Sequence, residues 1–121
     1  MEEAGIRARL RALIEGDSDP KLEAELPFAS MMITLMAASG VTPYESFKRM
    51  RSVDVLGKFR VEGDEIVRLV EVLGYDPLTA MEKRAETTIS RTYADFLEGY
   101  ISSVKSGGSV INYLMSKLRS I

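Results

Sequence analysis

The stretch that decides the fold covers residues 25–50 and reads ELPFASMMITLMAASGVTPYESFKRM. Its first half has a nearly uncharged helical pattern, in which apolar residues cover almost every face between Leu26 and Ala38. Because a helix that is apolar all round is normally buried, we expect this one to be hidden on every side. Gly40 ends the pattern, and Thr42-Pro43 opens a new helix with a favoured cap and a first-turn proline. A central buried helix predicts a helical bundle.

The same helix–glycine–cap–helix unit occurs three times, at Gly40 with Thr42, Gly74 with Asp76, and Gly107 with Ser109. The three caps lie 34 and 33 residues apart. A period of about 34 is also that of tetratricopeptide solenoids, but the Trp, Leu-Gly and Tyr positions of that repeat are not reproduced. A closed bundle of helical hairpins is therefore favoured, with a helical-repeat adaptor as the alternative.

Helical periodicity runs through nearly the whole chain, and strand patterns are absent. We expect an all-α compact bundle of six to seven helices in one domain, 1–121, with an N-terminal helix and linker in 1–20 and the core in 21–121. The first helix should cover residues 2–14, and residues 52–61 form the least regular region. The predicted core is Phe28, Met32, Leu35, Phe47, Leu69, Leu73, Met81, Phe96, Leu97, Tyr100, Ile101 and Leu114.

Composition excludes most enzyme classes. The 121 residues include no cysteine and no histidine, and the net charge is −2. Without those side chains, thiol nucleophiles, Ser-His-Asp triads and zinc sites cannot be built. Glu82 and Glu86 lie one helical turn apart, but Lys83 and Arg84 between them favour a solvated helix face. We therefore predict no catalytic residue, no cofactor and no metal site.

The chain carries no pattern typical of a membrane span or a signal peptide. The longest apolar run, residues 26–39, has 14 residues and is interrupted by polar ones, whereas a span needs about 20. Glu2 and Glu3 precede an Arg-rich amphipathic segment rather than an apolar one. The sequence alone thus predicts a soluble chain.

The densest group of cations is a set of five within 13 positions that contain only one acid, Asp54. This basic cluster consists of Lys48, Arg49, Arg51, Lys58 and Arg60. It predicts either a docking patch for an acidic partner or a solvated face around a loop.

Residues 37–50 also have features of a helix-turn-helix, with Lys48 and Arg49 placed to meet phosphates. The preceding helix is too apolar to lie across DNA, and the chain is acidic, so we predict no nucleic-acid partner. Met31, Met32 and Met36 are interpreted as core rather than as an adaptable binding groove.

Three segments resemble the type II secretion F domain. They are ELPFA (25–29) with ASGVTPYESF (38–47), then GYDPLTAM (74–81), and finally FLEGY (96–100) with SGGSVINYL (106–114). The resemblance covers residues 24–120 in the family's order and spacing, and it is nearer to the archaeal branch. That family is the cytoplasmic module of the membrane platform protein in type II secretion, type IV pilus and archaellum assembly.

The resemblance implies a scaffold without catalysis, at the cytoplasmic face of the cell membrane. Its partners would be a secretion or assembly ATPase, docked on the basic cluster, together with the membrane platform and filament subunits. Family members carry membrane spans around such domains. We therefore expect this chain to be excised from a polytopic membrane protein, with a span following Ile121. Two questions stay open, namely whether residues 1–20 belong to the family core and whether the domain forms a homodimer.

Overall fold

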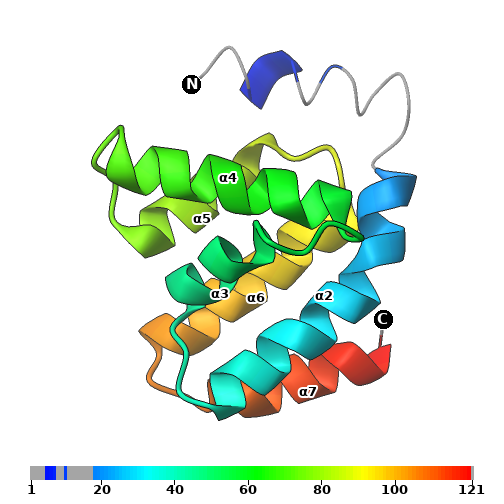
Figure 1. The fold of residues 1–121 in the computed structure, drawn as a ribbon, viewed down its shortest axis with the longest axis vertical. Helices are drawn as coiled ribbons and strands as arrows, with labels where there is room; N and C mark the ends of the chain where they lie inside the picture. Colours follow the sequence, from blue (N-terminus) through cyan, green and yellow to red (C-terminus); the bar gives the residue numbers. More distant parts are fainter. Residues whose placement is uncertain (1–4, 8–9, 11–17, 121) are drawn as a thin grey trace.

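The computed structural model describes residues 5–7, 10 and 18–120. The longer described range folds into helices joined by turns, without a β-strand (Figure 1). The helices are α2 (Pro20–Ala38), α3 (Pro43–Met50), α4 (Gly57–Glu71), α5 (Pro77–Thr87), α6 (Arg91–Lys105) and α7 (Val110–Ser120). The predicted all-α bundle is confirmed. Most of the helix predicted for residues 2–14 lies outside the described residues.

The helices pack as three pairs. Two pairs are sequence neighbours, α3 with α4 and α5 with α6, and α4 also packs on α5. The third pair joins α2 to α7, the first and last helices of the range 18–120, which lie side by side in Figure 1. In a solenoid each repeat contacts only its neighbours. Packing of α2 on α7 therefore makes this a closed bundle of hairpins.

The three predicted glycine–cap connections are confirmed. Gly40, Gly74 and Gly107 have φ of 85°, 78° and 72°, the left-handed region in which glycine has no Cβ penalty. Each cap then accepts a hydrogen bond from the backbone N–H three residues later, at N···O distances of 3.1–3.2 Å. The caps are Thr42, Asp76 and Ser109. These short segments thus end one helix and begin the next without help from distant residues.

Most of the predicted core is buried. The confirmed members are Phe47, Leu69, Met81, Phe96, Leu97, Tyr100, Ile101 and Leu114. Phe59 and Tyr93, which were not among the predicted core residues, join them and meet edge to face with ring centroids 5.5 Å apart. These rings connect α4 to α6, because Phe59 lies on α4 and Tyr93 on α6.

Three predicted core residues were wrong. Phe28, Leu35 and Leu73 are 59%, 64% and 51% exposed. Leu73 follows α4 in the turn before Gly74, so its side chain lies beyond the helix face that packs inward. Met32 is half-buried.

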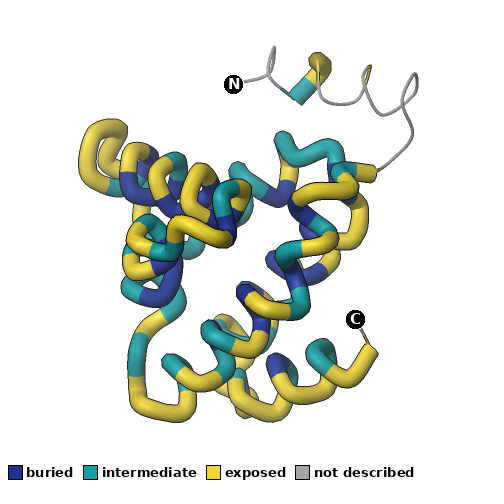
Figure 2. Tube along the Cα trace, turned by 45° about the vertical axis from the view of Figure 1, so that its right-hand side comes forward, coloured by how far each residue is buried: buried dark blue, intermediate teal, exposed yellow. Residues whose placement is uncertain are grey.

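The prediction that the helix over residues 26–38 is buried all round was also wrong. One face of α2, with Leu22, Leu26, Ala29 and Ile33, is buried, while other positions face outward. Figure 2 shows buried and exposed residues alternating along its length. Apolar composition on every face does not distinguish a central helix from an edge helix that has a second apolar surface. Pro27 lies inside this one continuous helix and does not start a new one.

The start of α4 explains why residues 52–61 look irregular in sequence. Gly57 begins the helix, and Leu56 before it has no capping side chain. The cap comes instead from α2, where the Glu25 carboxylate accepts hydrogen bonds from the backbone N–H groups of Lys58 and Phe59, all at 3.0 Å. A helix N-terminus attracts a carboxylate through its free N–H groups and dipole.

A second carboxylate of α2 supports the start of α6. Ser90 caps α6 by accepting from the backbone N–H of Tyr93 at 3.1 Å. The Ser90 hydroxyl in turn donates to Glu23 at 2.6 Å, and Glu23 also accepts from the backbone N–H of Asp19 at 3.1 Å. The first turns of α2 therefore hold the starts of both α4 and α6.

No helix among the described residues combines the length and the hydropathy that crossing a membrane would need.

Candidate partner-binding surfaces

The basic cluster lies where α3 ends and α4 begins. Lys48 and Arg49 are in the last turn of α3, Arg51 follows that helix, and Lys58 and Arg60 are in the first turns of α4. Because α3 packs on α4, the fold brings the two halves of the cluster to one connection.

Four of the five cations have an acidic neighbour. The ion pairs are Lys48 with Glu71 at 3.7 Å, Arg49 with Glu45 at 3.5 Å, Lys58 with Asp19 at 3.7 Å, and Arg60 with Asp54 at 3.5 Å. Most of these side chains are exposed to solvent. Exposed pairs at such distances contribute about 0–1 kcal/mol each. They balance the local charge, yet a carboxylate on another molecule can replace the acidic partner at little cost.

Arg51 has a structural role instead. Its Nε donates to the backbone carbonyl of Lys48 at 3.0 Å, at the C-terminal end of α3. The last carbonyls of a helix lack intrahelical donors and carry partial negative charge, which a cation complements. Lys48 and Arg49, in the same last turn, complement the dipole of α3 as well.

The exposed face of α2 is a second surface, which sequence reasoning missed. Six positions along this face are exposed, and we call this row the α2 stripe. They are Lys21, Ala24, Phe28, Met31, Leu35 and Ala38. The spacing between them alternates between three and four residues, so they lie in one line along the helix. The spacing can be found in the sequence, but the apolar residues of the opposite, buried face made the whole helix look uniformly apolar.

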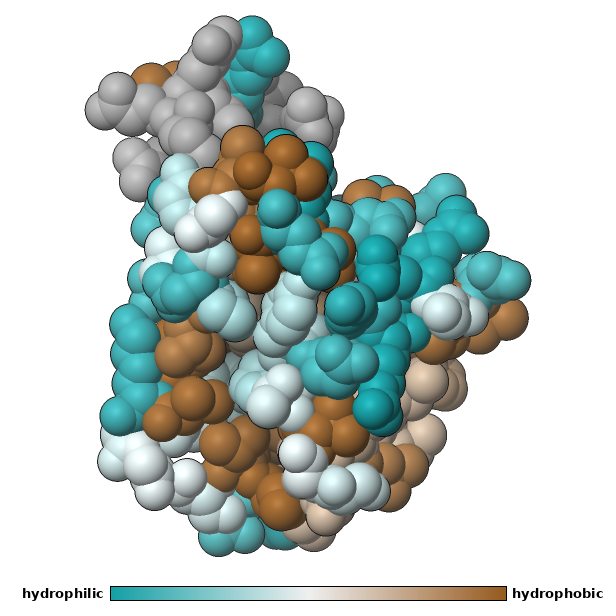
Figure 3. Space-filling model, turned by 60° about the vertical axis from the view of Figure 1, so that its left-hand side comes forward, coloured by the Kyte–Doolittle hydropathy of each residue, from teal (hydrophilic) through white to brown (hydrophobic). Residues whose placement is uncertain are grey.

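Further apolar side chains are exposed on α7, which packs along α2. Ile111 and Met115 lie one helical turn apart, and both are exposed. Only Leu114 of α7 is buried. Figure 3, which brings forward the left side of Figure 1, shows other hydrophobic groups separated by hydrophilic side chains on that face.

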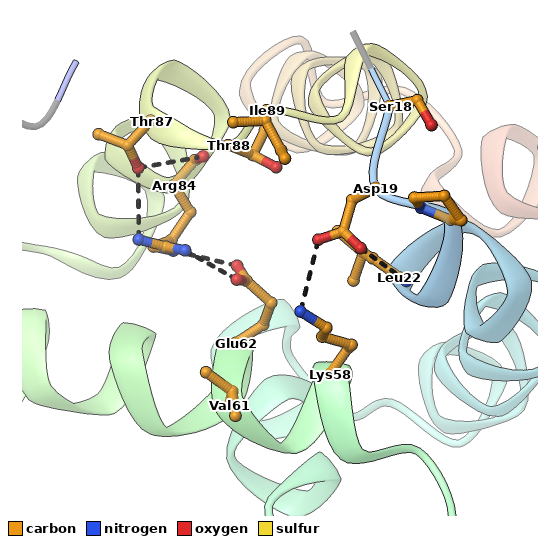
Figure 4. Close-up of a pocket in the computed structure, with 11 residues that line it drawn as sticks. Ser18, Asp19, Leu22, Lys58, Val61, Glu62, Arg84, Thr87, Thr88 and Ile89 are labelled. Carbon is orange, nitrogen blue, oxygen red and sulfur yellow. Dashed lines mark hydrogen bonds and ion pairs between the residues drawn. The ribbon is translucent and has the colours of Figure 1, made fainter. Parts of the chain in front are cut away.

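A polar pocket of about 410 Å³ lies between the start of α2, the first half of α4 and the α5–α6 connection. Figure 4 shows the Arg84 guanidinium pointing at the Glu62 carboxylate, and Lys58 pointing at Asp19. Arg84 Nε and Nη2 donate to the two oxygens of Glu62 at 3.0 and 2.8 Å. Arg84 also donates to the Thr87 hydroxyl at 3.3 Å.

The Glu62–Arg84 pair is mostly shielded from water, with side-chain exposures of 8% and 23%. Burial lowers the pKa of Arg84, but the hydrogen bonds and charge of Glu62 outweigh burial and leave this pKa above its ordinary value. Burial and the charge of Glu62 raise the pKa of the Tyr93 hydroxyl well above its ordinary value. The pocket's charged groups are thus engaged with each other: Glu62 and Arg84 tie α4 to α5, and Lys58 and Asp19 tie α4 to the start of α2.

The paired acids on α5 behave as helix-surface groups. Glu82 forms an ion pair with Lys105 of α6. Across residues 18–120 and the few described before them, no three His, Cys, Asp or Glu side chains are arranged to hold a metal ion.

Comparison with known proteins gives a partial match. No family model matches the chain. No solved structure matches it either. The chain is 25% identical over 91 residues to a protein of Methanocaldococcus jannaschii described as uncharacterized protein MJ1286. The match covers 75% of this chain but only 15% of that relative, so this chain spans a small part of the relative's length.

Proposed function

We propose that this chain is a non-catalytic cytoplasmic scaffold module of a membrane platform protein, of the type II secretion F-domain kind. In this role it docks a secretion or assembly ATPase and supports filament assembly or protein secretion. The observation that carries the proposal is the ordered resemblance of the three glycine–cap units and their flanking helices to that family.

The backbone conformation of the three glycine–cap units supports the proposal. Gly40, Gly74 and Gly107 are the three described glycines with positive φ, and each is followed by a side-chain cap. The residues that carry the resemblance therefore set where helices end and begin. Proteins that share a fold keep the positions of these helix ends. A chain that matches a short part of a long archaeal relative also favours a module within a larger protein.

The basic cluster is the proposed ATPase-docking surface. Its exposed cations exchange weak internal pairs for carboxylates on the ATPase, and complementary charge mainly accelerates association. Lys48, Arg49 and Arg60 are the residues to test, because Arg51 holds the end of α3 and Lys58 faces the polar pocket.

The test replaces Lys48, Arg49 and Arg60 by Glu and measures binding to the cognate ATPase by interferometry at two salt concentrations. Reversal should slow association at low salt, with a smaller effect at high salt, where charges are screened. A control with Lys105, Lys117 and Arg119 replaced by Glu makes the same change in net charge outside α3 and α4. Equal binding by wild type and the first variant at low salt contradicts the docking surface.

Two further measurements separate this function from its rivals. The proposal requires apolar membrane spans in the full-length protein that contains the domain, which its gene sequence will show. A helix-turn-helix protein would instead bind DNA with an affinity that falls steeply with salt. Salt-dependent DNA binding, without binding to the ATPase, would favour a nucleic-acid-binding function over the platform scaffold.

A further inference from the structure

The α2 stripe has the spacing of a helix-pairing seam. Its residues follow each other at steps of three, four, three, four and three, which is the a/d pattern of a heptad repeat. Phe28, Met31 and Leu35 form its centre and are 59%, 47% and 64% exposed. Contiguous apolar rows of this kind mark interaction sites when no element of the same fold covers them.

The charges around the stripe disfavour a lipid surface as its occupant. Helices that lie on membranes carry Lys and Arg along the border of the apolar face. α2 has one basic residue, Lys21, and two acidic ones, Glu23 and Glu25. From residue 26 to the end of the helix it has no charged residue at all. Another apolar helix is the better match.

The order of side chains along the stripe is complementary to itself when reversed. Consider an antiparallel pair of α2 helices whose two-fold axis passes between residues 29 and 30. Each stripe residue then faces the residue of the other copy for which the two residue numbers add up to 59. Leu35 then faces Ala24 of the other copy, and Phe28 faces Met31. Each large aliphatic side chain meets a small one, and the central thioether meets an aromatic ring, a favourable contact.

The outer layers fit as well. Lys21 faces Ala38, so its ammonium group lies by the C-terminal end of the α2 helix of the other copy. That end has no basic residue in its last turn, and its free carbonyls attract a cation. A two-fold interface requires that residue i contacts j and j contacts i, which this pairing satisfies at every layer.

We propose that the α2 stripe binds the α2 stripe of a second copy of this chain, antiparallel and with two-fold symmetry. Phe28, Met31 and Leu35 leave roughly 300 Å² of apolar surface per copy at the exposures above. This area is well below the roughly 800 Å² per partner of a standard stable interface, so the dimer should be weak and reversible. The dimer should therefore form and dissociate with concentration. This inference does not depend on the proposed ATPase docking.

The first experiment measures self-association of the 121-residue chain by sedimentation equilibrium. Replacing Phe28 and Leu35 by Glu buries charges at the seam and should weaken association by at least about tenfold. The control replaces Val55 and Val72, which are 87% and 73% exposed outside the stripe, by Glu. It should dimerise like wild type. At a concentration where the wild type is monomeric, both variants should retain its melting temperature, because all four side chains then face solvent.

A second experiment fixes the register through disulfide crosslinking, which is clean because the chain has no cysteine. Ala24→Cys and Leu35→Cys chains are oxidised separately and as an equal mixture. Antiparallel pairing places residue 24 opposite residue 35 of the other copy, so the mixture should crosslink and each chain alone should not. In a parallel pair each residue would face its own counterpart, so crosslinking of either chain alone overturns the antiparallel arrangement.

Other occupants of the stripe give distinct outcomes. A chain that stays monomeric at the highest concentration that remains in solution overturns the dimer. If that monomer binds vesicles of mixed anionic and neutral lipid through Phe28 and Leu35, the occupant is a membrane. If the chain lacking residues 1–17 dimerises while the whole chain does not, those residues occupy the stripe in its place.

Discussion

The three glycine–cap connections and the start of α4 reach the same result by different physical routes. At Gly74, for example, the turn, the cap Asp76 and the first helical Pro77 are consecutive in sequence. At Gly57, the helix begins without a local cap, and Glu25 arrives from a helix more than thirty positions earlier. A local connection is encoded by the residues that form it, whereas the cap at the start of α4 forms only when α2 and α4 have packed together.

The difference teaches where the stability of this bundle resides. Each local connection supplies one cap bond and one permissive backbone angle, and such features contribute about 1 kcal/mol apiece. A distant contact between buried groups, such as Glu62 with Arg84, should cost much more when one member is removed, whereas the partly solvent-exposed Glu25 cap should cost no more than a local one. Four substitutions test this ordering.

Arg84→Met should cause the largest loss of folding stability. It leaves the Glu62 carboxylate buried without its cation, a situation that costs about 3 kcal/mol or more. Urea denaturation will measure the free energy of unfolding. Adding Glu62→Leu should recover much of the loss, because two apolar groups no longer strand a charge. If the double variant is as unstable as Arg84→Met, the pair is not what holds α4 to α5.

Gly63→Ala should be the next most damaging, although helix propensity alone predicts a gain of up to about 1 kcal/mol inside α4. A Cβ at this position would overlap the Phe47 carbonyl oxygen and come within 2.9 Å of Arg51 Cγ. Separating α3 from α4 to relieve that contact should cost about 2 kcal/mol net. Thermal melts compare it with Gly57→Ala, where nothing lies within 4 Å. A stabilised Gly63→Ala chain would refute the close approach.

Gly74→Val tests a local connection. The residue has φ of 78°, which a β-branched side chain strongly disfavours, so the expected loss is between about 1 and 2 kcal/mol. Gly107→Val should behave alike. Melting temperatures that match wild type would show that neither turn requires glycine.

Glu25→Ala should have the smallest effect of the four. It removes the acceptor for two backbone N–H groups at the start of α4, and solvent partly replaces it, so the loss should be about 0.5 to 1 kcal/mol. Thr42→Ala, which removes a local cap, provides the reference. A much larger loss for Glu25→Ala would mean that the distant cap contributes more than a local one.

The sequence predicted the fold class, the glycine turns and eight of the twelve proposed core residues, because these depend on periodicity and on short-range capping. It failed for Phe28 and Leu35, since hydrophobicity shows which residues avoid water but not which neighbour is present to cover them. It also missed α4's start, because nothing near Gly57 marks a cap supplied by Glu25.

The candidate surfaces were predictable to different degrees. The five cations of the basic cluster lie close enough in sequence to be found by counting charges. Two of their acidic partners, Glu71 for Lys48 and Asp19 for Lys58, come from other elements and could not be found in this way. The polar pocket could not be found, because Glu62 and Arg84 lie on different helices and neither has a distinctive sequence context. ATPase docking stays a prediction.

The packing of α2 on α7 has a consequence for the order of folding. The hairpins α3–α4 and α5–α6 close over short loops, whereas α2 and α7 must meet from the two ends of the range 18–120. Closing a longer loop costs more chain entropy and slows assembly. With a single buried side chain, Leu114, α7 should dock last and open first. Pulse-labelled hydrogen exchange should find its amides protected after those of α4 and α6, and simultaneous protection would show concerted folding instead.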